Sequence, residues 1–338
     1  MYLNKKSIVR LLALVIVAVL SAVILAGCRS KNSSTNTDPV KTDEPQPTEL
    51  PDVSPLLWRV TDNAGHTLYL FGTIHVGDNR NNAVLERLAP ILDKCDALAV
   101  EFDVEAYAKN TQQMMQDMTQ YVLTDGSLVS DHMPAELYDR AYKLLQRAGL
   151  FPSAFTHYNV AWWSQMVESA ALTVYTKLDS EKAMDSLLIR RAYKNSKPVL
   201  EVESSGFQMT LLNSFEDELY LMMIEDSLDN TEDLDSQLTE LYELWLSGDK
   251  DAFWSYLTSE DEIDETAGQY TDAQIAMFEN YNRALLDDRN LGMRDRAIEY
   301  IAGGRTVFFA VGAAHMANDV GLVKLLADAG YTVEAVSY

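Results

Sequence analysis

Residues 69–78 read Tyr69-Leu70-Phe71-Gly72-Thr73-Ile74-His75-Val76-Gly77-Asp78, an apolar run that ends in Gly-x-x-His. The same pattern returns near the other end of the chain, in Phe308-Phe309-Ala310-Val311-Gly312-Ala313-Ala314-His315. Each apolar run predicts a buried strand, and a glycine at its end allows the backbone to turn sharply. We therefore expect His75 and His315 to project together over the carboxyl edge of a sheet, where α/β proteins usually bind ligands.

Further strands are predicted on both sides of these two runs. Residues 57–60 and 67–72 flank the turn-forming segment 62–65 and predict a hairpin. The other expected strands are 97–102, 198–203, 306–311 and 331–336, while helical spacing dominates about 104–195 and 207–301. Strands at both ends with helices between them predict an α/β (α+β) fold with a central mixed sheet and large helical insertions.

Two carboxylates also fall at predicted strand ends. Glu101 follows the strand residues 97–100, and Glu203 follows 199–202. A charged group in such a place is costly unless it is paired, so each carboxylate could bind either an arginine or a ligand. Two imidazoles with carboxylates also suit a divalent metal ion (Mn, Co or Zn) that keeps a position open for water. Which glutamate would be the ligand and which the base stays open.

The amino terminus has the features of a lipoprotein export signal. Lys5, Lys6 and Arg10 precede an apolar run over residues 11–27 that is short for a spanning helix. It ends in Leu25-Ala26-Gly27-Cys28, which resembles a bacterial lipobox. We expect residues 1–27 to be a signal peptide and Cys28 to carry the lipid; an uncleaved membrane anchor is the alternative. Either would place the protein on the extracytoplasmic face of the cell membrane.

Residues 28–55 are predicted to be the lipidated cysteine and a disordered linker, because the segment is polar and almost free of large apolar side chains. The folded domain is expected over 56–338. The chain has 27 Lys and Arg against 51 Asp and Glu, a formal net charge of −24, which argues against nucleic-acid binding. Because only two cysteines occur, no disulfide framework is expected, and Cys95 is predicted to be a buried thiol.

From about Leu56 to Val336 the chain resembles the TraB/PrgY/GumN family, which is related to the Tiki metalloproteases and more distantly to erythromycin-esterase-like proteins. The residues that carry this resemblance are Phe71-Gly72-Thr73-Ile74-His75, Glu101, Ala183-Met184-Asp185 with Leu187-Leu188, Glu203-Ser204 with Gln208, Arg289-Asn290, Val311-Gly312-Ala313-Ala314-His315 and Gly330-Tyr331-Thr332-Val333. They cover nearly the whole predicted domain.

The resemblance implies a metal-dependent hydrolase site. It assigns the metal to His75, His315 and Glu101, and further catalytic roles to Glu203, Arg289 and Asn290, with Arg289 as a stabiliser of the oxyanion. The resulting prediction is a lipid-anchored extracytoplasmic hydrolase that acts as a peptidase. Two alternatives remain: a non-catalytic surface receptor that sequesters peptides, as in pheromone-shutdown relatives, and a metal-free hydrolase with a histidine as general base. The sequence identifies neither the peptide nor the oligomeric state.

Overall fold

The structure is a computed structural model that describes residues 53–258, 270–317 and 319–338. Six strands in this part of the chain form one mixed sheet in the order β4-β3-β5-β2-β1-β6. They are β1 (Leu57–Thr61), β2 (Thr67–Thr73), β3 (Ala97–Val100), β4 (Val199–Glu201), β5 (Val307–Gly312) and β6 (Thr332–Ala335). Strands β2, β5, β3 and β4 run parallel, whereas β1 is antiparallel to both β2 and β6. The predicted mixed sheet and its opening hairpin are confirmed.

Most helices lie in two long segments, one between β3 and β4 and one between β4 and β5. The first holds α4 (Val104–Tyr107), α5 (Thr111–Met118), α6 (Ala135–Arg147), α7 (Val160–Tyr175) and α8 (Met184–Lys194). The second holds α9 (Ser205–Leu212), α10 (Asp217–Asp229), α11 (Leu234–Ser247), α12 (Lys250–Thr258), α13 (Asp272–Leu285) and α14 (Asp287–Ala302). The others are α3 (Arg80–Leu92), α15 (Leu322–Asp328) and the short 3₁₀ helix η6 (Ala313–Met316). The α+β class is therefore confirmed.

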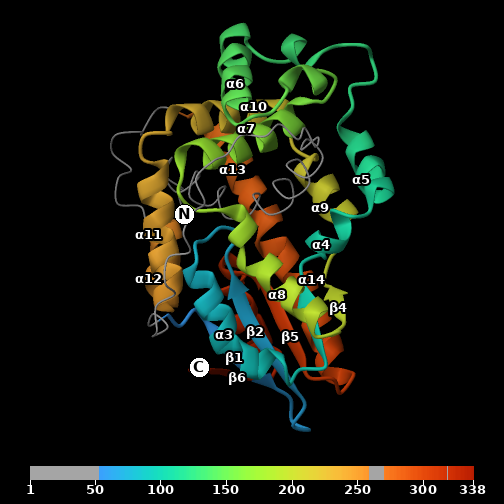
Figure 1. The fold of residues 1–338 in the computed structure, drawn as a ribbon, viewed down its shortest axis with the longest axis vertical. Coiled ribbons are helices and arrows are strands. Elements are labelled where there is room, and N and C mark those ends of the chain that lie inside the picture. The colour runs from blue at the N-terminus through green and yellow to red at the C-terminus, as the bar shows by residue number, and fades with distance from the viewer. Residues whose placement is uncertain (1–52, 259–269, 318) are drawn as a thin grey trace, which may run out of the picture.

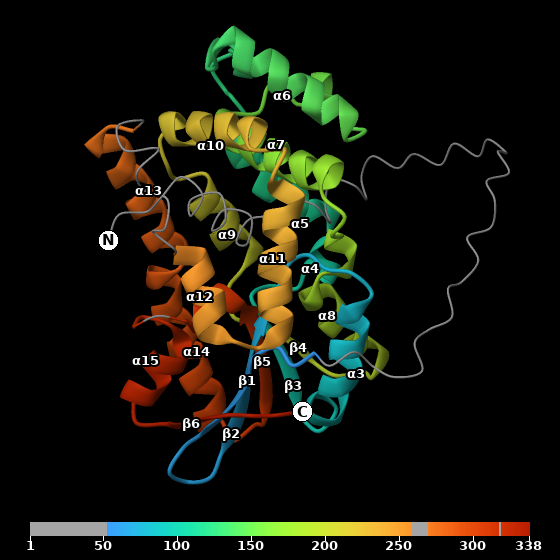
Figure 2. The same cartoon turned by 90° about the vertical axis from the view of Figure 1, so that its left-hand side faces the viewer.

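Strands β3 and β5 are buried on both faces, which explains why their sequences are apolar throughout rather than alternating. Phe309 of β5 packs with α14 and α15 on one face, and its neighbour Phe308 packs in the larger core on the other face. Figure 2 shows α14 and α15 on one side of the sheet and α3 and α8 on the other. Helices α6, α7 and α10 lie at the far end of the molecule from the β1–β2 turn (Figure 1).

The described part of the chain begins inside the fold rather than in a linker. Val53 is only 4% exposed, and the backbone N–H of Ser54 donates to the carbonyl of Leu246 at 3.0 Å. Tyr338 donates its hydroxyl to the carbonyl of Pro55 at 2.7 Å. Residues 53–55, at the end of the expected linker, thus pack between α11 and the carboxyl terminus.

The expected signal peptide (1–27), the lipidation residue Cys28 and the linker up to residue 52 lie outside the described residues. In the portion that is described, none of the helices has the length and apolar character needed to span a membrane. Cys95 is 3% exposed, and burial raises the pKa of its thiol to about 12, which is typical of an unreactive structural cysteine.

Candidate functional site

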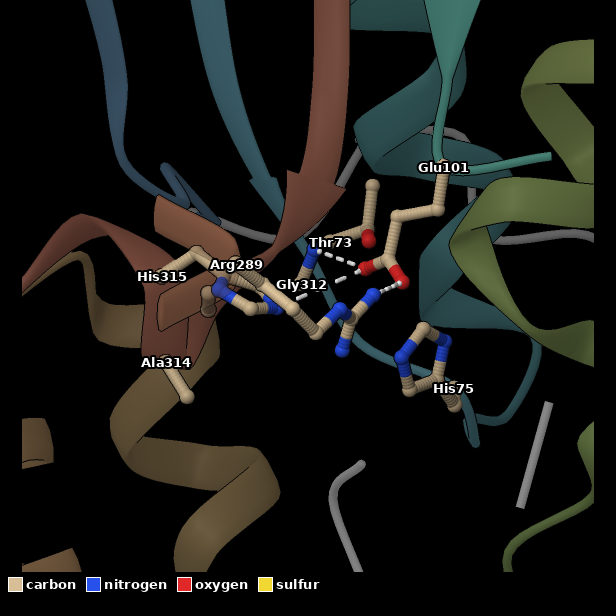
Figure 3. A pocket seen from close by; sticks show the side chains of 8 residues that line it. Thr73, His75, Glu101, Arg289, Gly312, Ala314 and His315 are labelled. Carbon is tan, nitrogen blue, oxygen red and sulfur yellow. Dashed lines mark hydrogen bonds and ion pairs between the residues drawn. The ribbon is translucent and has the colours of Figure 1, made fainter. Parts of the chain in front are cut away.

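The register of the parallel strands brings the two Gly-x-x-His motifs to the same level. Gly72 pairs with Val311, and Thr73 pairs with Gly312, so β2 and β5 end together. Strand β3 lies on the other side of β5 and ends at Val100, immediately before Glu101. Parallel strands share one carboxyl edge, and His75, His315 and Glu101 therefore meet there although they are far apart in sequence (Figure 3).

A small pocket lies at this edge and encloses about 10 Å³, enough room for about one water molecule. Its lining residues are Thr73, His75, Glu101, Arg289, Gly312, Ala313, Ala314 and His315. A Cβ atom placed on Gly312 would lie 3.4 Å from Glu101 Oε1, 3.5 Å from His75 Nε2 and 3.6 Å from His315 Cδ2. Because all three atoms surround one point, the two imidazoles are close enough to act on the same molecule.

The His75 ring is oriented by a buried carboxylate. Asp185, in the first turn of α8, contacts His75 Nδ1 through Oδ2 at 2.8 Å and accepts the hydroxyl of Thr73 at 2.6 Å. A carboxylate at this place favours a proton on Nδ1, which leaves the Nε2 lone pair facing the pocket. Burial alone would lower the pKa of His75, but the charges of Asp185 and Glu101 outweigh burial and raise it.

The His315 ring is oriented by a neutral amide instead. Asn290 of α14 contacts His315 Nδ1 through Oδ1 at 2.7 Å and uses its own Nδ2 to donate to the carbonyl of Val320 at 2.9 Å. The Asn290 oxygen must therefore accept, so Nδ1 of His315 carries the hydrogen and Nε2 is unprotonated. Burial, the cation of Arg289 and the nearby His75 lower the pKa of His315 to about 3, which keeps the ring neutral.

The two glutamates are bound by one arginine. Arg289 of α14 donates from Nη2 to Glu101 Oε2 at 2.5 Å and to Glu203 Oε2 at 2.7 Å, and from Nε to Glu203 Oε1 at 3.0 Å. Gln208 of α9 donates to both carboxylates as well, at 3.0 and 2.9 Å. The backbone N–H of Gly312 donates to the other oxygen of Glu101 at 2.9 Å.

This pairing controls the charge of the site. Burial by itself would raise the pKa of Glu101, but the cation of Arg289, the two histidines and the Gly312 N–H hold it well below its usual range. Glu101 and Glu203 in turn raise the pKa of Arg289 against the effect of burial. The three groups form a buried, ionised cluster, which is the arginine-paired arrangement that the sequence had left open beside metal binding.

The residues named from the sequence divide into two groups. His75, His315, Glu101, Arg289 and Gly312 line the pocket. The remaining three do not: Glu203 lies behind Arg289, Asn290 lies behind His315, and Gly72 lies under η6, where a Cβ would be 3.0 Å from Ala313 Cα. In this arrangement Glu203 contacts Arg289 and Gln208 rather than lining the pocket, and Asn290 contacts the far side of the His315 ring.

The other histidines lie elsewhere. His66 is exposed and pairs with Asp62, His132 contacts the hydroxyl of Ser127, and His157 is exposed. The role of Asp185 was missed, although the sequence pattern around it contributed to the family resemblance, and so was the role of Gln208. Both lie on helices whose distance from the strand ends could not be predicted from the sequence. Thr73 was also missed as a pocket residue, although it lies inside the first Gly-x-x-His motif, between Gly72 and His75.

The donor chemistry of the pocket suits a divalent metal ion, because two imidazole Nε2 atoms with fixed tautomers and one carboxylate oxygen face a common space. Within residues 53–258, 270–317 and 319–338, however, no three His, Cys, Asp or Glu side chains already stand as a metal-binding group. One oxygen of Glu101 is held by Arg289, so that at most the oxygen near Gly312 remains for an ion.

Comparison with known proteins gives a family match and two relatives. The model of the TraB/PrgY/gumN family matches residues 56–335. The chain is 25% identical to uncharacterized protein YbaP of Escherichia coli (strain K12) over 262 residues, which are 76% of this chain and 87% of that protein. The protein of the same name from Shigella flexneri gives the same identity and coverage. No solved structure gives a significant match.

Proposed function

Because the chain belongs to the TraB/PrgY/gumN family, we propose that it is a hydrolase that cleaves peptides in the pocket at the ends of β2 and β5. One observation carries the proposal: His75 and His315 each have Nδ1 bound to a buried acceptor, so in the neutral form of each ring Nε2 is the unprotonated nitrogen, and both rings line one water-sized space. Two fixed imidazoles around a single water are an arrangement that can activate it for attack on a carbonyl group.

We propose His75, His315 and Glu101, through the oxygen that Arg289 does not bind, as the residues that would hold a divalent metal ion (Mn, Co or Zn). When bound, such an ion lowers the pKa of its water and polarises the scissile carbonyl. Asp185 and Asn290 orient the two imidazoles, and the Gly312 N–H fixes the Glu101 oxygen. Arg289 lines the pocket and has one Nη1 hydrogen without a partner in the described residues, so it can donate to the developing oxyanion.

A metal-free reaction is the second candidate, and the Asp185–His75 pair favours it. In that reaction His75 Nε2 takes a proton from water while the water oxygen bonds to the carbonyl carbon. The carbon–nitrogen bond then breaks, and the imidazolium returns the proton to the departing amine. Asp185 stabilises the transient positive charge on His75, and Arg289 already pairs with both Glu101 and Glu203. Retention of full activity in chelator would select this reaction.

The decisive experiment combines metal analysis with a peptide-cleavage assay. The wild type, His75→Ala and His315→Ala are purified without a histidine tag, assayed for bound metal, and incubated with a peptide library in Mn²⁺, Co²⁺, Zn²⁺ or chelator. Wild-type cleavage that both substitutions abolish supports the hydrolase, and His66→Ala is the matched control because His66 is exposed and distant from the pocket. Peptide binding without cleavage in any metal would instead support a sequestering receptor.

We also propose that Cys28 is lipidated and anchors the protein on the extracytoplasmic face of the membrane. The support is the order of Lys5, Lys6 and Arg10, an apolar run and Leu25-Ala26-Gly27-Cys28 in the sequence. Cys28→Ser is expected to leave the precursor unprocessed or release the protein into the medium. Unchanged detergent partitioning and unchanged size of the variant would contradict the anchor without affecting the hydrolase proposal.

A further inference from the structure

The guanidinium of Arg289 is shared unequally between the two glutamates. It donates to Glu203 from both Nε and Nη2, at 3.0 and 2.7 Å, so this carboxylate is bound on both of its oxygens. Glu101 receives a single hydrogen bond from Nη2, at 2.5 Å. Arg289 would therefore keep a bidentate partner without Glu101, but it would keep only one hydrogen bond to a carboxylate without Glu203.

The two carboxylates also differ in position. Glu101 lines the pocket, whereas Glu203 is not among the lining residues. Their main chains are joined, because the backbone N–H of Glu203 donates to the carbonyl of Glu101 at 2.8 Å. Arg289 thus pairs with one carboxylate at the pocket and with a second one outside the pocket lining.

Glu101 would not be left without partners if Arg289 released it. Gln208 donates to the same oxygen, Oε2, at 3.0 Å, and the backbone N–H of Gly312 donates to Oε1 at 2.9 Å. These two neutral donors hold the carboxylate at the pocket. The contact with Arg289 is therefore one that a second cation could replace while Glu101 stays where it is.

A metal ion in the pocket would be opposed by Arg289, which is buried and lines the same pocket. Figure 3 shows the guanidinium beside the carboxylate of Glu101. Two positive charges repel each other more strongly at a buried place than in water, and the guanidinium also occupies one oxygen of a proposed metal ligand. This opposition becomes smaller the more firmly Glu203 holds Arg289.

We propose that Arg289 competes with a divalent metal ion for Glu101, and that Glu203 is a positioning residue that favours the ion by retaining Arg289. The inference rests on the proposed function, because the ion is the one assigned to His75, His315 and Glu101. It goes further by giving Glu203 a role outside the ligand set, and it predicts a site that binds its metal weakly and reversibly. The exchange also releases one Nη2 hydrogen of Arg289 beside the pocket.

Titration of the full-length protein with Co²⁺ tests the competition without an activity assay. Calorimetry gives the affinity, and the visible absorption of Co²⁺ reports its ligands. The variant that combines His75→Ala with His315→Ala measures binding elsewhere on the chain. Glu203→Gln leaves Glu101 as the only carboxylate for Arg289, so we expect Co²⁺ to bind at least about tenfold more weakly than to the wild type.

A paired substitution, Arg289→Gln with Glu203→Gln, should act in the opposite direction. It removes one positive and one negative charge, so the net charge is unchanged while Oε2 of Glu101 is freed. Co²⁺ should then bind at least about tenfold more tightly than to the wild type. If Glu203 were itself a ligand, both variants would bind more weakly. Arg289→Met with Glu203→Met is the second form of the pair, because apolar side chains often replace a buried ion pair without loss of stability.

Arg296 and Glu299 provide the matched control, since they form an exposed ion pair on the same helix with an Nη1–Oε2 distance of 2.7 Å. Glu299→Gln, alone and together with Arg296→Gln, should leave the affinity for Co²⁺ unchanged. Thermal melts establish that each variant is folded.

The competition is overturned if folded Glu203→Gln binds Co²⁺ as tightly as the wild type, if neither paired variant binds it more tightly, or if none of these proteins binds it at millimolar concentration. Opposite shifts in a protein that cleaves no peptide would sustain the competition and contradict the hydrolase. Cleavage that persists in chelator, without any binding of Co²⁺, would sustain the hydrolase and contradict the competition. The two proposals therefore fail by different measurements.

Discussion

Single buried partners determine what the two histidines can do. Asp185 gives His75 a charged acceptor, whereas Asn290 gives His315 a neutral one. The difference separates the two rings electrostatically, since the pKa of His75 is raised and that of His315 is lowered to about 3. Two histidines that look equivalent in the sequence are therefore suited to different tasks, a result that depends on residues behind the pocket rather than in it.

The first prediction concerns Asp185→Asn. The amide would offer a donor where the carboxylate now accepts from both Thr73 and His75, so one of these residues would lose its acceptor and the His75 tautomer would no longer be fixed. We expect peptide cleavage to fall roughly 10- to 100-fold, the usual effect of removing such a partner. Steady-state kinetics measure the loss, and circular dichroism establishes that the variant is folded.

Asp117→Asn is the matched control, because Asp117 is equally buried but pairs with Gln113 and Ser205 outside the pocket. Comparable losses of activity in both variants would show that the effect of Asp185→Asn is general destabilisation and not a changed His75.

The second prediction uses the pH dependence of stability. Glu168 has a pKa of about 8 in the folded protein against an ordinary 4.5, so between these values the folded state holds a proton that the unfolded chain has released. The free energy of unfolding must then fall as pH rises through this window, by about 1.4 kcal/mol per pH unit at most. Chemical denaturation at several pH values should show this fall in the wild type and a smaller one in Glu168→Gln. A surface change, Glu225→Gln, should reproduce the wild-type slope.

At this scale the sequence predicted the residues that end strands but not the partners that orient them. His75, His315 and Glu101 follow apolar runs that can be recognised from composition alone, so their meeting at one edge could be inferred from the chain order of the strands. Asp185 and Gln208 come from α8 and α9, and nothing local to those helices fixes which strand end they approach. Tertiary packing determines how close these two helices lie to each strand end, and this packing cannot be predicted from a single sequence.

The strand ends differ in how much space each glycine leaves. A methyl group on Gly72 would lie 3.0 Å from the backbone of Ala313 and 3.1 Å from its side chain, which is too close for η6 to keep its place. Gly312 is different, because a methyl group there would make ordinary contacts of 3.4–3.6 Å with Glu101, His75 and His315. Its backbone, with φ of −50°, is also one that alanine adopts readily.

The third prediction follows from this contrast. Gly72→Ala should destabilise the protein by roughly 1–3 kcal/mol, because backbone atoms of η6 must shift. Gly312→Ala should leave the melting temperature nearly unchanged but abolish cleavage, since its methyl group would occupy the space that the water needs. Thermal melts and activity assays on the same two proteins provide the comparison. An active Gly312→Ala variant would mean that the reaction takes place outside this pocket.

Elements were predicted well where local pattern governs them. The hairpin of β1 and β2 and the end of α14 near Gly303 and Gly304 follow from turn and capping residues, and Gly304 indeed has a positive φ of 71°. Residues 53–55 were assigned to the linker because their composition is polar and proline-rich. Their place was decided by contacts with Leu246 and Tyr338, which are distant in sequence.

For the molecule as a whole, the position of β5 matters most. It is the fifth strand in the chain but lies in the interior of the sheet, paired with β2 on one side and β3 on the other. No other strand links these two halves. The core between the sheet and α14 includes Val307, Phe309 and Val311 of this strand and therefore depends on it as well.

The fourth prediction is that a chain ending at residue 304 will not fold cooperatively, because β2 and β3 then have no common neighbour. Urea denaturation followed by tryptophan fluorescence should show no sigmoidal transition. A chain ending at residue 330 lacks only the partly exposed edge strand β6 and should retain a transition at lower urea concentration. Cooperative unfolding of the shorter chain would show that the helical segments are stable on their own.

The interior position of β5 in the sheet also affects when the pocket can assemble during protein synthesis. A ribosome makes the chain from its amino terminus, and domains generally fold only once their parts are available. His75 and Glu101 are made before the strand that brings them side by side and supplies Gly312 and His315, and about 200 residues separate that strand from Glu101. A nascent or prematurely terminated chain thus contains no assembled pocket. Synthesis itself delays whatever chemistry the site performs until the chain has been made as far as His315.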